Sequence, residues 1–296
     1  MDVRQLRYFI ATAEEGHLGR AADRLHLSQP ALSRQIQLLE QQFGAPLFTR
    51  TPKGVVLTQI GEMLLADARK VHHLFDQTVE RIQRAARGEL GTLEVGAFGT
   101  ALFEYVPKLL ARHVRKHPDV TVRLHHAPME DLVAALRQGS VQVVFERRVL
   151  DEPDIVARVA TREPAYLAVS EHHALAARDN VELVTLRGEP LINGRDIGRT
   201  RGTVEFCREH GFEPTVVREV ADMTLGVVLV ASGIGSCIVP ASLLNLQLPG
   251  VVYRPLVTRS DASFDLYCYH LREPAPPPVL KALLDTMEGE PGEPTR

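Results

Sequence analysis

The sequence predicts an α+β protein in which a small helical module, one long helix and two α/β lobes follow one another. Three observations predict this organisation. Residues 1–58 carry the apolar spacing of short helices before two β-prone runs, residues 59–88 contain no proline, and residues 89–288 alternate between strand and helix patterns. A chain of 296 residues exceeds one small domain, so two or three domains are expected.

The segment from Leu18 to Phe43 has the pattern of a helix-turn-helix. A short helix with one apolar edge ends in a corner at His26-Leu27, and Ser28 can cap a second helix that has Pro30 in its first turn. Apolar residues of the second helix recur at threes and fours, so they share one face. We expect that face to be buried; its members are Leu32, Ile36, Leu39 and Phe43.

The opposite face of this second helix carries hydroxyl, amide and guanidinium groups. Arginine and glutamine are the side chains that recognise base edges in the major groove, whereas hydroxyls and cations bind phosphates. An ordinary solvated helix face is the alternative. Two β-prone runs around Pro52-Lys53-Gly54 favour DNA, because a hairpin wing there places Arg50 and Lys53 beside the helix. The predicted DNA contacts are Ser28, Gln29, Pro30, Ser33, Arg34, Gln37, Arg50 and Lys53.

This region resembles the signature of the LysR-type transcriptional regulators. The resemblance implies a winged helix-turn-helix, a long dimerising linker helix and an effector domain like a periplasmic binding protein. It rests on Ala21-Ala22-x-x-Leu25, Ser28-Gln29-Pro30-Ala31-Leu32-Ser33-x-x-Ile36, Leu39-Glu40, Gly44, Leu47-Phe48-x-Arg50 and Leu57-Thr58-x-x-Gly61.

The net charge of −3 conceals an uneven distribution along the chain. Residues 1–88 carry 12 Lys and Arg against 9 Asp and Glu, whereas the remainder carries 22 against 28. The positive balance therefore lies with the predicted DNA-binding helix. Because the bias is modest, affinity for DNA should depend on where individual cations lie and on dimerisation more than on bulk charge.

The segment from Thr58 to Arg87 predicts one helix about 45 Å long, more than the preceding module can cover. We expect it to pair with the same helix of a second subunit, and packing on its own chain is the alternative. Its apolar stripe is Leu64, Ala68, Val71, Phe75, Val79, Ile82 and Ala86. We therefore divide the chain into a DNA-binding domain at 1–58, a linker helix at 59–88, an effector domain at 89–288 and a flexible tail at 289–296.

Beyond Arg87 the chain alternates between strands and helices, and the first set of them predicts a parallel sheet with helices on both faces. The first lobe should comprise about 89–160 and 264–288, and the second about 161–263. Expected strands are 93–98, 120–125, 141–145, 165–169, 190–193, 216–220, 236–239 and 264–270, and expected helices are 102–114, 129–138, 203–210, 223–231 and 276–287.

Small anions bind beyond the carboxyl ends of such strands, where helices present free N–H groups. Gly99-Thr100 follows the first strand and precedes a helix, so its amides and hydroxyl could hold a carboxylate. A simple helix cap is the alternative role for Thr100, and the two roles are compatible. On the second lobe, Asn193-Gly194-Arg195 and Arg201-Gly202-Thr203 form the expected opposing wall.

Phe98-Gly99-Thr100, Phe145-x-Arg147 and Glu163 also resemble the ligand pocket of the LysR-type branch that senses aromatic breakdown products such as muconates and benzoates. The resemblance implies that Arg147 is the anion partner and that Glu163 is buried beside it. The chain departs from that branch at Pro128, where a hydroxyl residue is usual. Proline removes both a side-chain and a backbone donor there.

The sequence also bears on other classes of protein. No apolar run reaches the ~18 residues of a membrane span and no signal segment is visible, so a cytoplasmic protein is expected. The three cysteines, Cys207, Cys237 and Cys268, suggest neither a metal site nor a disulfide framework. Gly233-Ile234-Gly235-Ser236 follows a helix and precedes a strand, the reverse of what a dinucleotide site or a nucleophile elbow needs, so no enzyme is expected.

We therefore expect a LysR-type activator without a cofactor, whose effector is a small organic acid anion, in a pathway of aromatic catabolism. Its expected partners are double-stranded operator DNA, RNA polymerase and further copies of itself, as a homodimer through the linker helix and a homotetramer. A ligand-independent DNA-binding repressor or architectural protein is the alternative. A solute-binding protein would carry an export signal in place of a helix-turn-helix.

Overall fold

The computed structural model describes residues 1–194, 203–258 and 263–288. Within the sequence predictions, Arg195, Arg201, Gly202 and the flexible tail at 289–296 lie outside the described residues. The chain divides into two compact units, Met1–Arg84 and Ala85–Arg296, which are described separately below.

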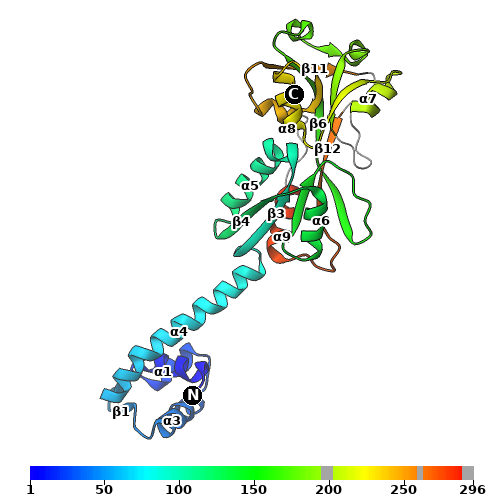
Figure 1. Ribbon diagram of the computed structural model, residues 1–296. Helices are drawn as coiled ribbons and strands as arrows, with labels where there is room; N and C mark the ends of the chain where they lie inside the picture. The colour runs from blue at the N-terminus through cyan, green and yellow to red at the C-terminus, as the bar shows by residue number, and fades with distance from the viewer. Residues whose placement is uncertain (195–202, 259–262, 289–296) are drawn as a thin grey trace. The chain divides into compact units, whose positions relative to one another are not determined.

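The first unit is a helical module with a two-stranded wing (Figure 1). An Asp2 side chain caps its first helix, and Gly16 ends that helix in a left-handed conformation. The predicted helix-turn-helix is confirmed, and its corner at His26 has a positive φ of 57°. The elements are α1 (Val3–Glu15), α2 (Leu18–Arg24), α3 (Gln29–Phe43), β1 (Phe48–Thr51), β2 (Gly54–Leu57) and α4 (Gln59–Ala86).

The core of the first unit lies where α1, α2 and α3 meet the beginning of α4. Leu32, Ile36 and Leu39 are buried in it as predicted, but Phe43 is 44% exposed and the prediction for that residue was wrong. Phe43 is the last residue of α3, and it is not a member of the core cluster of this unit. Apolar spacing correctly predicted the helix and the face that it buries. It could not predict where along the helix the buried face ends, because that depends on which elements pack against it.

The apolar stripe of α4 divides into two parts. Ala68 is buried in the core of the module and Leu64 packs against that core, so this part of the stripe serves the chain's own fold. From Val71 onward the stripe lies exposed. The exposed fractions are 46% for Val71, 47% for Phe75, 39% for Val79 and 60% for Ile82.

The second unit contains the predicted first lobe, in which helices cover both faces of a sheet (Figure 1). Three parallel strands lie in the order β4-β3-β5, and β12 continues the sheet in the antiparallel sense. The helices α5 and α9 pack on one face and α6 on the other. The elements are β3 (Gly91–Ala97), η1 (Gly99–Phe103), α5 (Tyr105–Lys116), β4 (Val120–His126), α6 (Met129–Arg137), β5 (Val143–Glu146), β12 (Ser263–Leu271) and α9 (Pro278–Glu288).

A single long strand, β6 (Ile155–Ser170), belongs to both lobes. It pairs with β12 over Ile155–Pro164 and with β10 and β11 from Ala165 onward. The helices α7 and α8 contribute to two core clusters of the second lobe. Its elements are η2 (Ala174–Ala177), β7 (Val181–Glu182), η3 (Leu183–Leu186), β8 (Pro190–Gly194), α7 (Thr203–Glu209), β9 (Thr215–Val220), α8 (Met223–Ala231), β10 (Cys237–Pro240), η4 (Ala241–Asn245) and β11 (Val251–Val257).

Among the described residues, none of the helices combines the length and the apolar character that a membrane span requires. The three cysteines are buried and free. Burial raises the pKa of the Cys207 thiol to about 11, so this side chain packs as a small apolar group.

Candidate functional site

The helix α3 presents the predicted DNA-binding side chains on its exposed side. Ser28 caps the helix through its hydroxyl, which accepts a hydrogen bond from the Ala31 amide at 3.4 Å. Arg34 is exposed and has no hydrogen-bond or ion-pair partner among the described residues. Of the eight predicted contacts, Ser33 is half-buried, and the exposed ones are Ser28, Gln29, Pro30, Arg34, Gln37, Arg50 and Lys53.

The wing is fixed to the helical module by backbone and side-chain contacts. Val55 donates its amide to the Gly16 carbonyl at 2.9 Å. The Glu40 carboxylate of α3 accepts the amides of Leu47 and Phe48 at 2.8 and 3.1 Å, which ties the helix to the beginning of the wing. Glu40 belonged to the quoted signature, but its anchoring role could not be inferred from spacing. The wing thereby carries Lys53 at a fixed position relative to α3.

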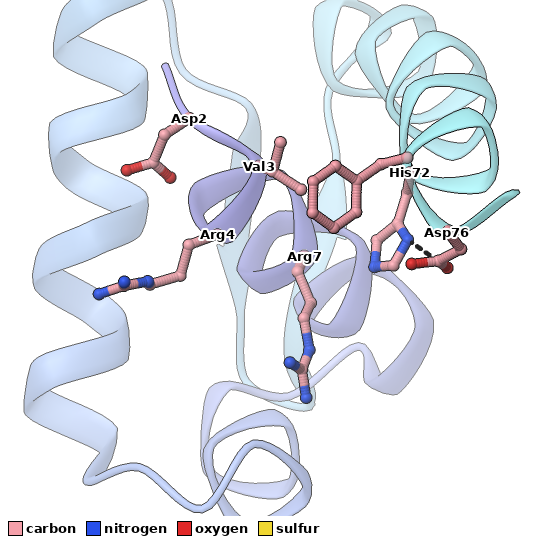
Figure 2. Close-up of a pocket in the computed structure, with 7 residues that line it drawn as sticks. Asp2, Val3, Arg4, Arg7, His72 and Asp76 are labelled. Atoms are coloured by element: carbon pink, nitrogen blue, oxygen red, sulfur yellow. Dashed lines mark ion pairs between the residues drawn. The ribbon is translucent and has the colours of Figure 1, made fainter. Parts of the chain in front are cut away.

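A groove of about 530 Å³ lies between α1 and α4 in the same unit. Figure 2 shows that Val3, Arg4 and Arg7 come from α1, whereas His72 and Asp76 come from α4 and form an ion pair at 2.9 Å. Asp2, the N-cap of α1, and Phe75, a member of the exposed apolar stripe, also line the groove. None of the predicted DNA contacts lines this groove.

In the second unit, a buried hydrogen-bond network lies at the carboxyl ends of the parallel strands. The Arg147 Nε donates to the Thr100 hydroxyl oxygen at 2.6 Å, and its Nη2 donates to a Glu163 carboxylate oxygen at 2.6 Å. All three residues are less than 10% exposed. The structure thus brings together three of the predicted ligand residues from three different segments. Charge-assisted bonds between buried groups hold such an arrangement in one geometry.

Ser242, in η4 of the second lobe, completes the network. Its amide donates to the other Glu163 oxygen at 2.8 Å, and its hydroxyl accepts from Arg147 Nη2 at 3.2 Å. Arg147 Nη1 also donates to the Phe264 carbonyl at 3.3 Å. The network therefore connects the two lobes, and it uses four of the five N–H groups that an arginine offers.

This geometry changes the expected role of Arg147. Its charge is already matched by Glu163, and most of its N–H donors are occupied. Its main role is therefore to hold the Thr100 side chain in place, and it is not a free cation for a ligand. Because the Thr100 oxygen accepts from Arg147, the hydroxyl hydrogen can donate to a further acceptor. A ligand carboxylate beside Thr100 would be such an acceptor.

The other predicted ligand residues form no hydrogen bond with this network among the described residues. The Phe98 ring stacks on His126 with centroids 5.4 Å apart. Pro128 occupies the N-cap position of α6 and provides no side-chain cap. Asn193 and Thr203 are buried in the second lobe at 4% and 3% exposure, and no hydrogen bond among the described residues joins them to Thr100 or Arg147.

Three residues near the network were not found from the sequence. Glu146 accepts the Arg147 amide at 2.6 Å, and burial raises its pKa. Ser242 lies 95 residues after Arg147 in the chain, so no local pattern connects them. His126 is the last residue of β4, and it pairs with Ala97, the last residue of β3, directly before Phe98. His126 could have been predicted to lie near Phe98, because β3 and β4 are parallel strands that end at the same edge. Ser242 could be identified only from the tertiary structure.

Comparison with known proteins decides the family. Residues 3–62 match the family described as "Bacterial regulatory helix-turn-helix protein, lysR family", and residues 86–291 match the "LysR substrate binding domain". The chain belongs to the LysR family. It is a DNA-binding transcriptional regulator and not an enzyme, as the sequence predicted.

Relatives of this LysR-type regulator match it over nearly their whole length. The transcriptional regulator TfdS of Cupriavidus pinatubonensis is 37% identical over 96% of this chain and 97% of that protein, and ClcR of Pseudomonas putida is 36% identical over 97% and 98%. The crystal structure of CbnR, a LysR family transcriptional regulator, superposes with a TM-score of 0.86 at 33% identity and covers 97% of this chain and all of that chain. CbnR in complex with its target DNA superposes with a TM-score of 0.79 at 32% identity, over 97% of this chain and 99% of that one.

Proposed function

We propose that this LysR-type regulator is an activator that responds to a small organic acid bound beside Gly99 and Thr100. The observation that carries the proposal is the buried Thr100, Arg147 and Glu163 network, which connects the lobes where parallel strands end. A ligand placed there contacts both lobes, so it can stabilise one arrangement of them over another. The resemblance to regulators that sense aromatic breakdown products favours benzoate-like and muconate-like acids.

We propose that the DNA contacts are made by the exposed side chains of α3 and by the wing. A pseudo-palindromic operator needs two such helices held at a fixed spacing. The exposed part of the α4 stripe supports a dimer through that helix, and two dimers would form a tetramer. An activator of this kind acts on RNA polymerase, and it works in the cytoplasm, where the chromosome lies.

Calorimetric titration of the full chain with benzoate and cis,cis-muconate tests the ligand proposal. Thr100→Val keeps the volume and removes the hydroxyl, so the dissociation constant of the active acid should rise roughly 5- to 30-fold. Arg147→Met should abolish the response to the acid, while operator affinity persists because the DNA-binding unit is separate. Thr121→Val, at an exposed position of β4, is the matched control and should bind as wild type does.

Two results would contradict the proposal in different ways. If Thr100→Val and Arg147→Met both bind the acid as wild type does, the ligand site lies elsewhere in the chain. If wild type binds none of the acids and its melting temperature does not change with them, the ligand-independent DNA-binding protein is favoured.

A further inference from the structure

The carboxylate of Asp222 lies against the turn at which we propose that the acid binds. Asp222 is the N-cap of α8 in the second lobe, and a methyl group on Gly99 would lie 3.4 Å from its Oδ1 and 3.7 Å from its Cγ. Gly99 has a φ of +59°, which favours glycine and leaves this side of the turn without a side chain. The second lobe thus places a carboxylate on the open side of the residue that precedes Thr100, about where the first atoms of a side chain would contact it.

Asp222 has no cationic partner among the described residues. One of its oxygens accepts the Thr224 amide at 2.9 Å, and the residue is half-buried. Arg147, the cation that the described part of the site places beside Thr100, is already matched by Glu163 at 2.6 Å. Among the described residues, the Asp222 carboxylate beside Gly99 is therefore not matched by a cation.

An unmatched carboxylate at this position restricts what a ligand can present to it. A hydroxyl or amino group on the ligand can donate to Asp222, because an ionised carboxylate only accepts hydrogen bonds. A second carboxylate on the ligand meets a like charge at short range, in a partly desolvated place where such repulsion is stronger than in water. Donors on the first lobe and an acceptor on the second thus favour an acid that has a donor beside its carboxylate.

We propose that Asp222 is a specificity-determining residue, which makes the site prefer monocarboxylic acids with an adjacent hydroxyl group over dicarboxylates. This inference rests on the proposed function, because it concerns the same site. The family resemblance implies benzoate-like and muconate-like acids alike, and this inference distinguishes between the two classes. Benzoate-like acids with a hydroxyl group fit the charges on both lobes, whereas muconate-like dianions do not.

The test is Asp222→Asn in the full chain, titrated with benzoate, 2-hydroxybenzoate and cis,cis-muconate at one ionic strength. Asparagine has the same shape and caps helices as well as aspartate, so α8 keeps its N-cap. Wild type should bind 2-hydroxybenzoate most tightly and muconate most weakly. The variant should gain about 5- to 50-fold in affinity for muconate and should lose part of its preference for the hydroxyl group.

Asp2→Asn is the matched control, because Asp2 caps α1 in the other unit through the same kind of bond, at 2.8 Å to the Gln5 amide. It should leave all three affinities unchanged. Asp222→Ser also retains a helix cap and gives the same test if the asparagine variant unfolds. An unchanged order of the three affinities in the Asp222 variants would overturn this inference alone. If none of the acids binds to wild type, the ligand proposal fails and this inference fails with it.

Discussion

Arg34 and Lys53 are both exposed cations of the DNA-binding unit, but they lie on different elements. Arg34 is in the middle of the exposed side of α3, where arginine can bind guanine with two hydrogen bonds, so Arg34→Ala should cost about 1–3 kcal/mol at the specific operator and relax sequence preference. Lys53 is in the turn of the wing, so Lys53→Ala should weaken all sequences equally and reduce the salt slope by about 1.

Competition binding of specific and unrelated duplexes at several salt concentrations separates these two effects. Each variant serves as the control for the other, because both remove one positive charge from the same unit. If Arg34→Ala discriminates between the duplexes as well as wild type does, the contact assigned to Arg34 is wrong.

His113 and His117 form a buried pair at the end of α5. Their rings lie 4.9 Å apart, and no ring nitrogen of either has a hydrogen-bond partner among the described residues. Burial, with the nearby His117 and Lys116, lowers the pKa of His113 to about 4. The folded protein therefore binds the proton less well than the unfolded chain does, whose histidine pKa is about 6.5. Stability should fall as the pH decreases from about 6.5 to 4, by about 3 kcal/mol from His113 alone.

Urea unfolding between pH 7.5 and pH 4 measures this loss. His113→Phe replaces the ring with one that cannot be protonated, so the decline in the free energy of unfolding with falling pH should be shallower than in wild type. His172→Phe is the control, since it makes the same substitution at a side chain that is 88% exposed. Parallel curves for wild type and His113→Phe would exclude His113 as the source.

Gly88 joins the end of α4 to the lobe that follows it in the chain. Its φ is +73°, and a methyl group there would lie 2.2 Å from the Pro278 carbonyl oxygen at the beginning of α9. Gly139 has nearly the same φ, +71°, but nothing lies within 4 Å of such a methyl group. Gly88→Ala should therefore destabilise the second unit by about 1–3 kcal/mol more than Gly139→Ala, because backbone must move to admit it. Thermal unfolding of the two variants measures the difference, and equal losses would show that only the dihedral angle matters.

Some helices and strands could be predicted from local sequence patterns, and others could not. Apolar spacing predicted α3 and α4 with small errors at their ends, because the apolar residues of each helix share one face. It found only residues 165–169 of β6. The earlier part of that strand carries residues such as Arg158 and Arg162, and it is a strand because β12 pairs with it. Pairing partners distant in sequence leave no local signal.

The candidate ligand site shows the same limit for individual side chains. Thr100 and Arg147 could be found because each follows a strand of a predicted parallel sheet, and parallel strands end at one edge. Ser242 and Asp222 come from the second lobe, and only tertiary packing brings them to that edge. The sequence therefore predicted that Thr100, Arg147 and Glu163 belong to one site, but it did not point to Ser242 or Asp222.

The α4 stripe from Val71 to Ile82 remains exposed in a single copy of the chain. Val71, Phe75, Val79 and Ile82 lie on one side of a helix and are each at least 39% exposed, whereas natural monomers rarely leave a long apolar stripe in water. The groove beside it, which Phe75 also lines, extends this surface toward α1 (Figure 2). A second copy of the helix would bury the stripe, so assembly should be lost when a charge is placed there.

Val71→Glu should separate the dimer, because pairing would bury an unpaired carboxylate at a cost of several kcal/mol. The isolated subunit should remain folded, since position 71 is already exposed within it. Operator affinity should fall in parallel, because one subunit binds only a half-site. Gln77→Glu adds the same charge on the side of α4 away from the stripe and is the matched control. Sedimentation velocity and operator binding on wild type and both variants measure these effects. A Val71→Glu protein that sediments like wild type would show that the stripe does not hold the subunits together.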